Sequence, residues 1–163
     1  MLVDELLPAA KRHMSISHDS SDALVKDMLA ASIELVETHY GVAIYRREQH
    51  EGAARGLYRP QFKPDGNIVV ANGRTRAVEG DGRLSIEADC AVAYTCGYET
   101  AEQIPYGIRQ ALFRLTLYQH EHRGDAVNRV DFGAAMTGMS GIGNIFAESG
   151  AATFLKPYRV MAA

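Results

Sequence analysis

The chain has 163 residues, 47% of them hydrophobic, and a formal net charge of -3 at pH 7. A chain of this length can bury most of its apolar surface in one domain without disulfides or metal ions. The mildly acidic net charge argues against a protein that binds nucleic acid over its whole surface, because such binding comes from many Lys and Arg contacts to phosphates. No stretch approaches the ~18 apolar residues of a membrane helix, and the start lacks a secretion-signal pattern. We therefore expect a soluble protein without membrane contact, kept in a reducing compartment.

Two helices are expected in the N-terminal part, residues 1–41. The first covers 4–14, with Pro8 in or near its first turn. The second runs from Asp22 to about His39 and ends at Gly41. Its apolar positions at helical spacing are Leu24, Val25, Met28, Leu29, Leu35 and Val36.

The middle part, residues 42–98, changes to short segments separated by Gly, Asn, Asp and Pro turns. Strands are expected near 42–50, 57–63, 67–71, 75–79, 83–87 and 90–96. The pattern predicts a small antiparallel sheet. In its last strand Val92, Tyr94 and Cys96 alternate with smaller residues and share one face.

A long helix is expected over 104–124, starting near Pro105. Its main apolar stripe consists of Ile108, Ala111, Leu112, Leu115 and Tyr118. A second apolar face carries Tyr106, Phe113 and Leu117. A helix with two apolar faces needs a separate packing partner for each face, so the second face predicts a contact with a neighbouring subunit.

The C-terminal part, residues 125–163, contains a glycine-rich stretch at 130–152 that we expect to be a flexible arm ordering against a partner. Its large apolar residues are Phe132, Met136, Met139, Ile142, Ile145 and Phe146. The predicted fold is α+β, a single domain over 1–163. It is a small helical bundle of two N-terminal helices plus the long helix, with an inserted antiparallel sheet and an extended C-terminal arm.

Catalytic chemistry finds little support in the residue pattern. Cys96 lies some nine residues before the next helix, and its sequence neighbours Glu99 and Glu102 would raise its pKa. Cys90 and Cys96 would lie about 20 Å apart along one strand, too far for a disulfide. The six histidines lack metal-ligand spacing. We expect no catalytic residue, no cofactor and no metal, hence not an enzyme; a Cys96-dependent enzyme stays the weakest alternative.

Four stretches of the chain, taken in order, resemble one known family. A strand end with the sequence VAYTCGY precedes a helix start and helix with the sequence IPYGIRQALFRLTLYQHEHR. The N-terminal stretch AAKRHMSISHDSSDALVKDMLAASIELVETHYG and the closing FLKPYRV fit the same pattern. Together they cover about half of the chain. They resemble the head-tail connector (adaptor) proteins of long-tailed bacteriophages and of prophage-derived particles.

The resemblance implies a structural virion protein. Family members form a homo-oligomeric ring, commonly a dodecamer, beneath the portal at the DNA-exit vertex. The ring continues the DNA channel and receives the next tail, stopper or neck component, while double-stranded DNA passes without specific binding. The resemblance thus implies a portal protein and a tail or stopper protein as partners. It also implies assembly in the bacterial host cytoplasm and a final place at the head-tail interface of the virion.

The resemblance also implies roles for particular residues. Helix packing maps onto Leu24, Met28, Leu35, Ile108, Leu112 and Leu115. The segment 154–159 is implied in portal docking or an intersubunit contact, with anchors at Phe154, Leu155, Tyr158 and Arg159. The strand-rich middle and the arm at 130–152 are longer than expected of the simplest members.

An alternative from another class is a small nucleic-acid-binding module that uses the basic region 46–76. Residues 42–83 hold eight Arg or Lys against five Asp or Glu. The basic side chains of this alternative are Arg46, Arg47, Arg55, Arg59, Lys63, Arg74 and Arg76. Strong, salt-sensitive DNA binding by the monomer would favour it.

Overall fold

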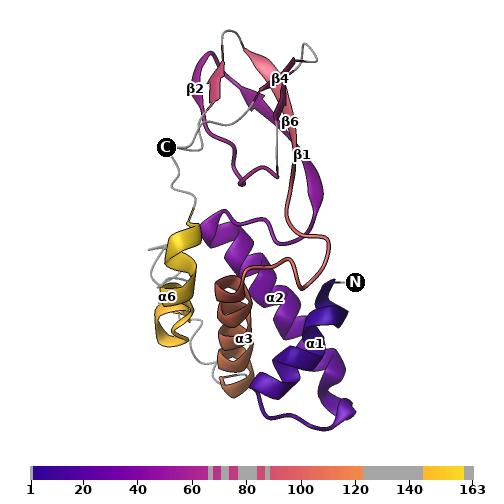
Figure 1. Cartoon of the computed structure of the whole chain (residues 1–163). Helices are drawn as coiled ribbons and strands as arrows, with labels where there is room; N and C mark the ends of the chain where they lie inside the picture. The colour runs from indigo at the N-terminus through magenta and orange to yellow at the C-terminus, as the bar shows by residue number, and fades with distance from the viewer. Residues whose placement is uncertain are drawn as a thin grey trace, which may run out of the picture. The chain divides into compact units, whose positions relative to one another are not determined.

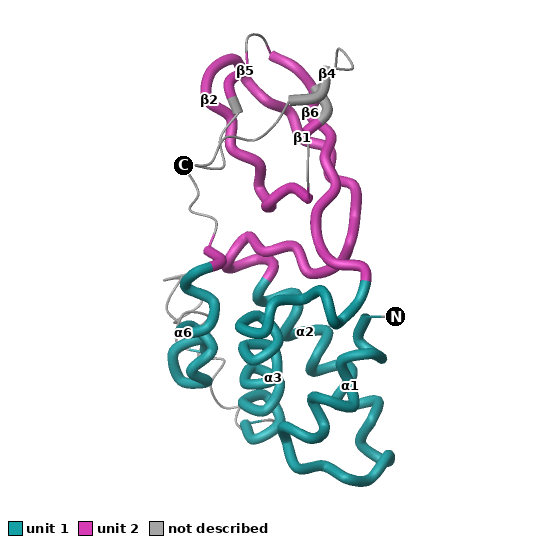
Figure 2. Tube along the Cα trace, viewed as in Figure 1, with its two compact units in different colours: residues 1–36, 100–157 teal, residues 37–99, 158–163 magenta. Residues whose placement is uncertain are grey.

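The computed structural model describes residues 2–65, 68–70, 74–76, 84–86, 89–122 and 145–159. The chain forms two compact units (Figure 2). The helical unit contains Met1–Val36 and Thr100–Pro157, and the β-rich unit contains Glu37–Glu99 and Tyr158–Ala163. The α+β class is confirmed; that 1–163 act as a single domain stays a prediction.

The helical unit is a small bundle in which α3 lies beside α6 and also contacts α1 (Figure 1). Its elements are α1 (Leu2–His13), η1 (Asp19–Ser21), α2 (Asp22–Tyr40, with its last turn from Glu37 assigned to the β-rich unit), α3 (Tyr106–Glu121), α6 (Ala151–Leu155) and η3 (Lys156–Tyr158, with Tyr158 assigned to the β-rich unit). Fully buried apolar side chains of this unit include Leu6, Leu29, Ile33, Ile108, Leu112, Leu115 and Leu155. The three long helices lie close to their predicted bounds, because their apolar residues repeat at helical spacing.

The buried face of α2 differs from the predicted one. Leu24 is 38% exposed and Leu35 is only partly buried, whereas the predictions placed both in helix packing. The face that α2 buries is made by Val25, Met28, Leu29, Ser32, Ile33 and Val36. Ser32 was missed because it is polar. Its hydroxyl lies 3.1 Å from that of Thr116 on α3. A polar contact between two hydroxyls therefore lies where the helical spacing alone suggests an apolar one.

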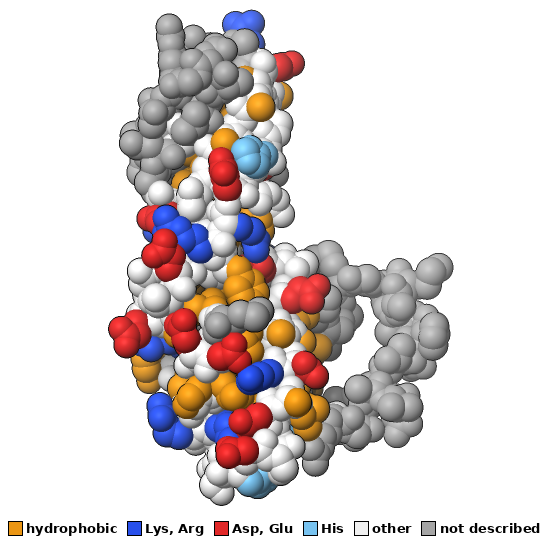
Figure 3. Space-filling model, turned by 90° about the vertical axis from the view of Figure 1, so that its right-hand side faces the viewer, with side chains coloured by type: hydrophobic (Ala, Val, Ile, Leu, Met, Phe, Trp, Pro, Cys, Tyr) orange, Lys and Arg blue, Asp and Glu red, His pale blue; other side chains and the backbone are white. Residues whose placement is uncertain are grey.

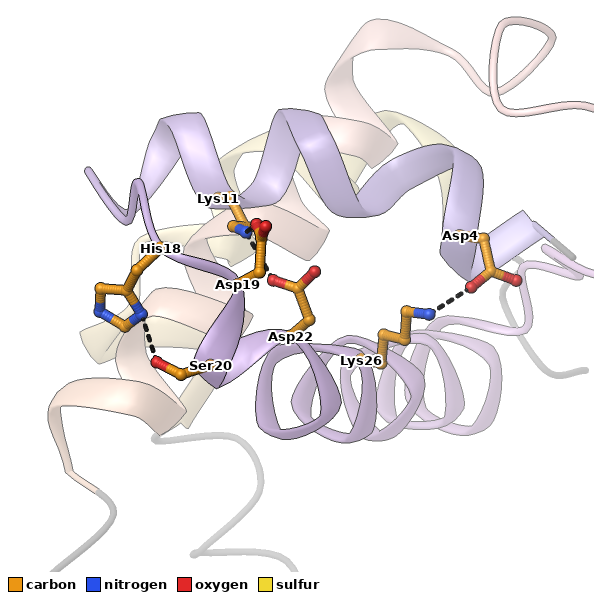
Figure 4. A network of polar contacts seen from close by, with 7 residues as sticks. All are labelled: Asp4, Lys11, His18, Asp19, Ser20, Asp22 and Lys26. Atoms are coloured by element: carbon orange, nitrogen blue, oxygen red, sulfur yellow. Dashed lines mark hydrogen bonds and ion pairs between the residues drawn. The ribbon is translucent and has the colours of Figure 1, made fainter.

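Ion pairs join α1 to the start of α2 (Figure 4). The Lys11 ammonium lies 2.8 Å from the Asp19 carboxylate and 2.5 Å from that of Asp22. At the other end of α1, Lys26 lies 2.7 Å from Asp4. The Lys11 side chain is 12% exposed and its bond to Asp22 is partly buried, whereas Asp19 is 92% exposed, so the pair with Asp19 lies at the surface.

The β-rich unit holds a four-stranded sheet in the order β1-β6-β3-β4 and a two-stranded sheet of β2 and β5, with all paired strands antiparallel. The strands are β1 (Arg47–Ala53), β2 (Gly56–Tyr58), β3 (Ile68–Val70), β4 (Arg74–Arg76), β5 (Leu84–Ile86) and β6 (Cys90–Cys96). Along the longest ladder Arg47 pairs with Cys96 and Ala53 with Cys90. Val92, Tyr94 and Cys96 are buried on one face, as predicted.

Strand β1 begins later than the predicted 42–50 because Glu37 holds the preceding backbone. The Glu37 carboxylate accepts hydrogen bonds from the amides of Ile44 at 2.6 Å and Tyr45 at 3.2 Å. It also accepts one from the Arg47 guanidinium at 2.8 Å. Amides bound to a carboxylate are not available to a neighbouring strand, so the ladder starts at Arg47. Gly41 ends α2 with φ at 65°, as predicted.

The corner after β6 is built on Gly97, whose φ is 89°. A Cβ there would lie 2.1 Å from the Tyr45 carbonyl oxygen, so no side chain fits. The next residue, Tyr98, donates its amide to the Ile44 carbonyl at 3.0 Å. The backbone geometry at Gly97 therefore makes this stretch an architectural corner.

None of the described helices is both long and apolar enough to cross a membrane.

Candidate subunit-contact site

The three residues of the second apolar face predicted for α3 differ in how far they are buried. Tyr106 is 66% exposed and Leu117 is half-buried, but Phe113 is only 5% exposed. The Phe113 ring packs against the His13 ring of α1, with centroids 5.9 Å apart. Contacts within the chain therefore already cover Phe113. The role of the three residues as a subunit contact stays a prediction, with Tyr106 the member most open to a partner.

The predicted C-terminal anchors are divided between the two units. In the helical unit Leu155 is fully buried, and Phe154 lies under the Arg114 guanidinium at 5.1 Å from the ring centroid. Tyr158 and Arg159 belong to the β-rich unit. Burial raises the pKa of Tyr98 and the nearby Tyr158 raises it further. Phe154 and Tyr158 are half-buried and Arg159 is exposed, so these three residues keep surface that a partner can contact. Leu155 is fully buried and contributes only to packing within the helical unit.

A hollow of about 480 Å³ lies at the C-terminal half of α3. Its lining consists of His13, Arg114, Leu117, Tyr118, Glu121, His122, Glu148 and Ser149. The Tyr118 hydroxyl donates to the Glu148 carboxylate, and its ring stacks on that of His122 with centroids 4.1 Å apart. Gly150, with φ at 71°, allows Arg114 to approach, because a Cβ there would lie 2.8 Å from the Arg114 Nη1.

Four of the predicted arm residues, Phe132, Met136, Met139 and Ile142, lie outside the described residues. Residues 145–148 are helical. Ile145 is half-buried there, and Phe146 is 1% exposed within the helical unit. The end of the predicted arm is thus anchored by a buried aromatic side chain, while its flexibility stays a prediction.

Arg109 of α3 was not among the residues that the sequence singled out. Its Nε is buried and has no hydrogen-bond partner among the described residues. A buried donor without an acceptor is costly and uncommon in folded proteins. Spacing could not reveal it, because only the packing around α3 decides which polar atoms lose water.

Exposed residues also form a stripe along α2. Leu24, Asp27, Ala31 and Glu34 are all exposed. Their spacings of three, four and three residues put them on one side of the helix. We call these four residues the α2 stripe. Neither of its carboxylates forms an ion pair with the part of the chain that the structure describes.

The basic region of the alternative reading is partly neutralised within the β-rich unit. Arg46 pairs with Asp65 at 3.1 Å and with Glu99 at 3.2 Å. Arg47 pairs with Glu37 at 2.8 Å. Arg55 and Lys63 are exposed, Arg59 is half-buried, and the side chains of Arg74 and Arg76 lie outside the description. Arginines that already hold carboxylates have less to offer a phosphate backbone.

Cys96 is fully buried on the inner face of β6. Burial raises the pKa of its thiol, and the Arg47 charge opposes this effect. The carboxylates that add to the rise are Glu37 and Glu51, not the sequence neighbours Glu99 and Glu102 that we expected. Strand pairing, rather than chain proximity, sets which charges a buried group meets. Such a thiol is a poor nucleophile near neutral pH.

Glu51 is the centre of a polar cluster beside the same strand. Its two carboxylate oxygens accept hydrogen bonds from the Tyr58 and Tyr94 hydroxyls. Burial raises the pKa of both tyrosines, so both stay protonated donors. The Tyr94 hydroxyl also accepts from the Phe62 amide at 3.2 Å. These hydrogen bonds connect Tyr58, at the end of β2, to β1 and the following Phe62 to β6. Among the described residues no three His, Cys, Asp or Glu side chains gather as metal ligands.

No protein-family model and no curated protein sequence matches this chain. Solved structures of gene transfer agent (GTA) particles contain chains of similar fold. In the virion of a native GTA particle the likeness has a TM-score of 0.60 at 17% identity and covers 96% of this chain and 90% of that one. In the neck of an empty GTA particle computed with C6 symmetry the TM-score is 0.59 at 16% identity, over 96% and 90%. In the neck of a native GTA particle computed with C12 symmetry it is 0.60 at 15% identity, over 99% and 92%. The chain shares the fold of these chains.

Proposed function

We propose that this chain is a head-tail connector (adaptor) subunit, a structural neck protein of a tailed-phage-like particle. The observation that carries the proposal is the fold shared with chains of GTA virion and neck structures over nearly the full length of both chains. The order of sequence motifs that resembles the connector family supports the same role independently. The role requires no catalytic residue and no cofactor.

In this role, copies of the chain form a ring beneath the portal protein and join it to a tail, stopper or neck protein. We propose twelve copies, because one of the similar neck structures was computed with C12 symmetry. Rings close through heterologous contacts, in which one surface of each copy meets a different surface of the next. Exposed Tyr106 on α3 and the accessible Phe154, Tyr158 and Arg159 near the C-terminus are the candidate contacts to neighbours and portal.

The ring would also continue the DNA channel. A channel must let double-stranded DNA pass, and each phosphate held by Lys or Arg would slow that passage. The net charge of -3 and the internally paired Arg46 and Arg47 suit this requirement. On the face drawn in Figure 3, positive and negative side chains alternate over the helical unit instead of forming one basic patch. The protein would be assembled in the bacterial host cytoplasm and remain at the head-tail interface of the virion.

The test is assembly of the purified chain, alone and with the portal protein of the same particle. We expect rings in negative-stain images, either free or only on the portal. A chain that stays monomeric and does not bind the portal would overturn the proposal. Strong binding of the monomer to DNA that weakens steeply with salt would favour the nucleic-acid-binding alternative.

A further inference from the structure

A guanidinium nitrogen in the helical unit has no acceptor among the residues that the structure describes. The Nε of Arg109 is buried without a hydrogen-bond partner, and its guanidinium forms no ion pair with the described residues. The side chain is nevertheless partly exposed. An acceptor that arrives from outside the chain can therefore meet the exposed part of this side chain, but not the buried Nε itself. A carboxylate is the acceptor that best matches the guanidinium, because it can take two guanidinium hydrogens at once.

Tyr106 lies one helical turn before Arg109, on the same side of α3. It is 66% exposed, which is high for a large aromatic side chain, and it lies in the first turn of the helix. An exposed tyrosine beside an arginine is the composition found at the centre of protein interfaces. We call Tyr106 and Arg109 the α3 patch.

The α2 stripe has the complementary chemistry. Asp27 and Glu34 lie seven residues apart on α2, which is about 10 Å along the helix. Between them Ala31 leaves room for close approach, and Leu24, 38% exposed, adds apolar surface at the end of the stripe. The stripe thus offers two carboxylates for a guanidinium and an apolar strip for an aromatic ring.

The α3 patch cannot use the α2 stripe of its own chain. Within one chain α2 meets α3 through Ser32, whose hydroxyl lies 3.1 Å from that of Thr116 and accepts a hydrogen bond from Gln119 at 2.9 Å. Glu34 is two residues further along α2, and at about 100° per residue it points to nearly the opposite side. The carboxylates of the stripe therefore face away from the α3 of the same copy.

We propose that the α3 patch of one copy docks on the α2 stripe of the next copy, as the heterologous contact that closes the ring. Arg109 binds Asp27 or Glu34 of the neighbour, and Tyr106 covers Leu24 and Ala31 of the neighbour. The occupant is a second copy of this chain because both halves of the contact, opposite in charge, are present on every copy. The inference rests on the proposed ring but names its surfaces, which the fold likeness does not.

The test is charge exchange measured by sedimentation velocity and negative stain, under the condition in which the wild type assembles, with or without portal protein. We expect Arg109→Glu and the double variant Asp27→Arg/Glu34→Arg each to lower the assembled fraction at least tenfold. Mixing the two in equal amounts should restore rings, because the acidic α3 patch of the first variant then meets the arginine-bearing stripe of the second. In the same mixture, the native Arg109 of the double variant meets the native acidic stripe of the other. Arg12→Glu, an equal charge change at an exposed position of α1, is the control and should assemble like the wild type.

The outcomes separate this inference from the proposed function. If the wild type assembles and Asp27→Arg/Glu34→Arg assembles equally well, the contact is wrong and the ring stands. That variant alters only exposed side chains, so it tests the contact even if Arg109→Glu fails to fold. The pairing would also be overturned if both variants are folded, as judged by circular dichroism, but lose assembly and do not recover it when they are mixed. If the wild type forms no ring and does not bind the portal, the proposed function fails and this contact with it.

Discussion

The α-carbon of Gly97 approaches the Tyr45 carbonyl so closely that a Cβ on Gly97 would lie 2.1 Å from that oxygen. The same Cβ would lie 2.8 Å from the Arg46 amide nitrogen. The clashing atoms are backbone, which cannot swing away as a flexible side chain can. The corner between β6 and the loop that leads to α3 therefore depends on glycine for two reasons, its positive φ and its missing side chain.

Gly97→Ala should lower the free energy of unfolding by about 3 kcal/mol or more, since a left-handed conformation and a steric clash act together. Urea unfolding followed by circular dichroism measures the loss. Gly52→Ala is the control: Gly52 lies on the adjacent strand β1, has ordinary φ, and a Cβ there would meet nothing within 4 Å. Equal stability of the two variants would contradict the close approach at the corner.

The buried pair of Ser32 and Thr116 should be coupled energetically. Ser32→Ala removes the acceptor of the Gln119 amide and should cost about 1–2 kcal/mol of unfolding free energy. A double-mutant cycle with Thr116→Val should give a coupling energy of about 0.5–1.5 kcal/mol. Ser17→Ala, at an exposed position before η1, serves as the control and should change stability by less than about 0.5 kcal/mol. Strict additivity in the cycle would show that the two hydroxyls do not interact.

Acid should weaken the link between α1 and α2. The hydrogen bond from Lys11 lowers the pKa of Asp19, and that from Lys26 lowers the pKa of Asp4, both below the ordinary value of 3.8. A lowered pKa means stability that is present above pH 3.8 and is lost as the pH falls through the folded-state pKa. Urea unfolding at about pH 7 and at about pH 3 should therefore differ less in Lys11→Met than in the wild type.

Lys156→Met, which removes an exposed lysine without an ion pair among the described residues, provides the comparison for this acid effect. It should keep the full pH dependence of the wild type. Should Lys11→Met and Lys156→Met have the same pH dependence, the ion pairs of Lys11 would contribute nothing to stability in solution, as happens for many surface pairs.

The Cys96 thiol should react slowly with iodoacetamide near neutral pH. Burial raises its pKa and also blocks access, whereas the thiolate is the reactive form. Cys90, which is partly exposed, is the internal control in the same molecule. Mass spectrometry of the alkylated peptides should find Cys90 modified first and Cys96 only after addition of urea. Rapid modification of Cys96 in the folded protein would revive the enzyme alternative.

Several features of the fold could be predicted because they depend on residues close together in the chain. The periods of the apolar residues predicted three long helices and a strand-rich middle, and Gly41 marked the end of α2. The burial of Val92, Tyr94 and Cys96 followed from strand alternation alone. Where the pattern is regular, local geometry dictates which side chains share a face.

The candidate site was harder to predict because it depends on contacts between residues that are far apart in the chain. Phe113 looked unpartnered because the spacing of α3 says nothing about His13, a residue of α1 one hundred positions earlier. Leu24 looked buried because it fits the period of α2, yet the helix is rotated so that Ser32 meets Thr116 instead.

By itself, the sequence determined the helices, the turns between short strands and an order of motifs that resembles one family. Only the tertiary structure decided that the Arg109 Nε is buried without an acceptor among the described residues and that Asp27 and Glu34 face away from their own α3. Local backbone preferences act over a few residues and leave a readable spacing. Burial and charge pairing depend on segments that meet only after folding, and no spacing along the chain records them.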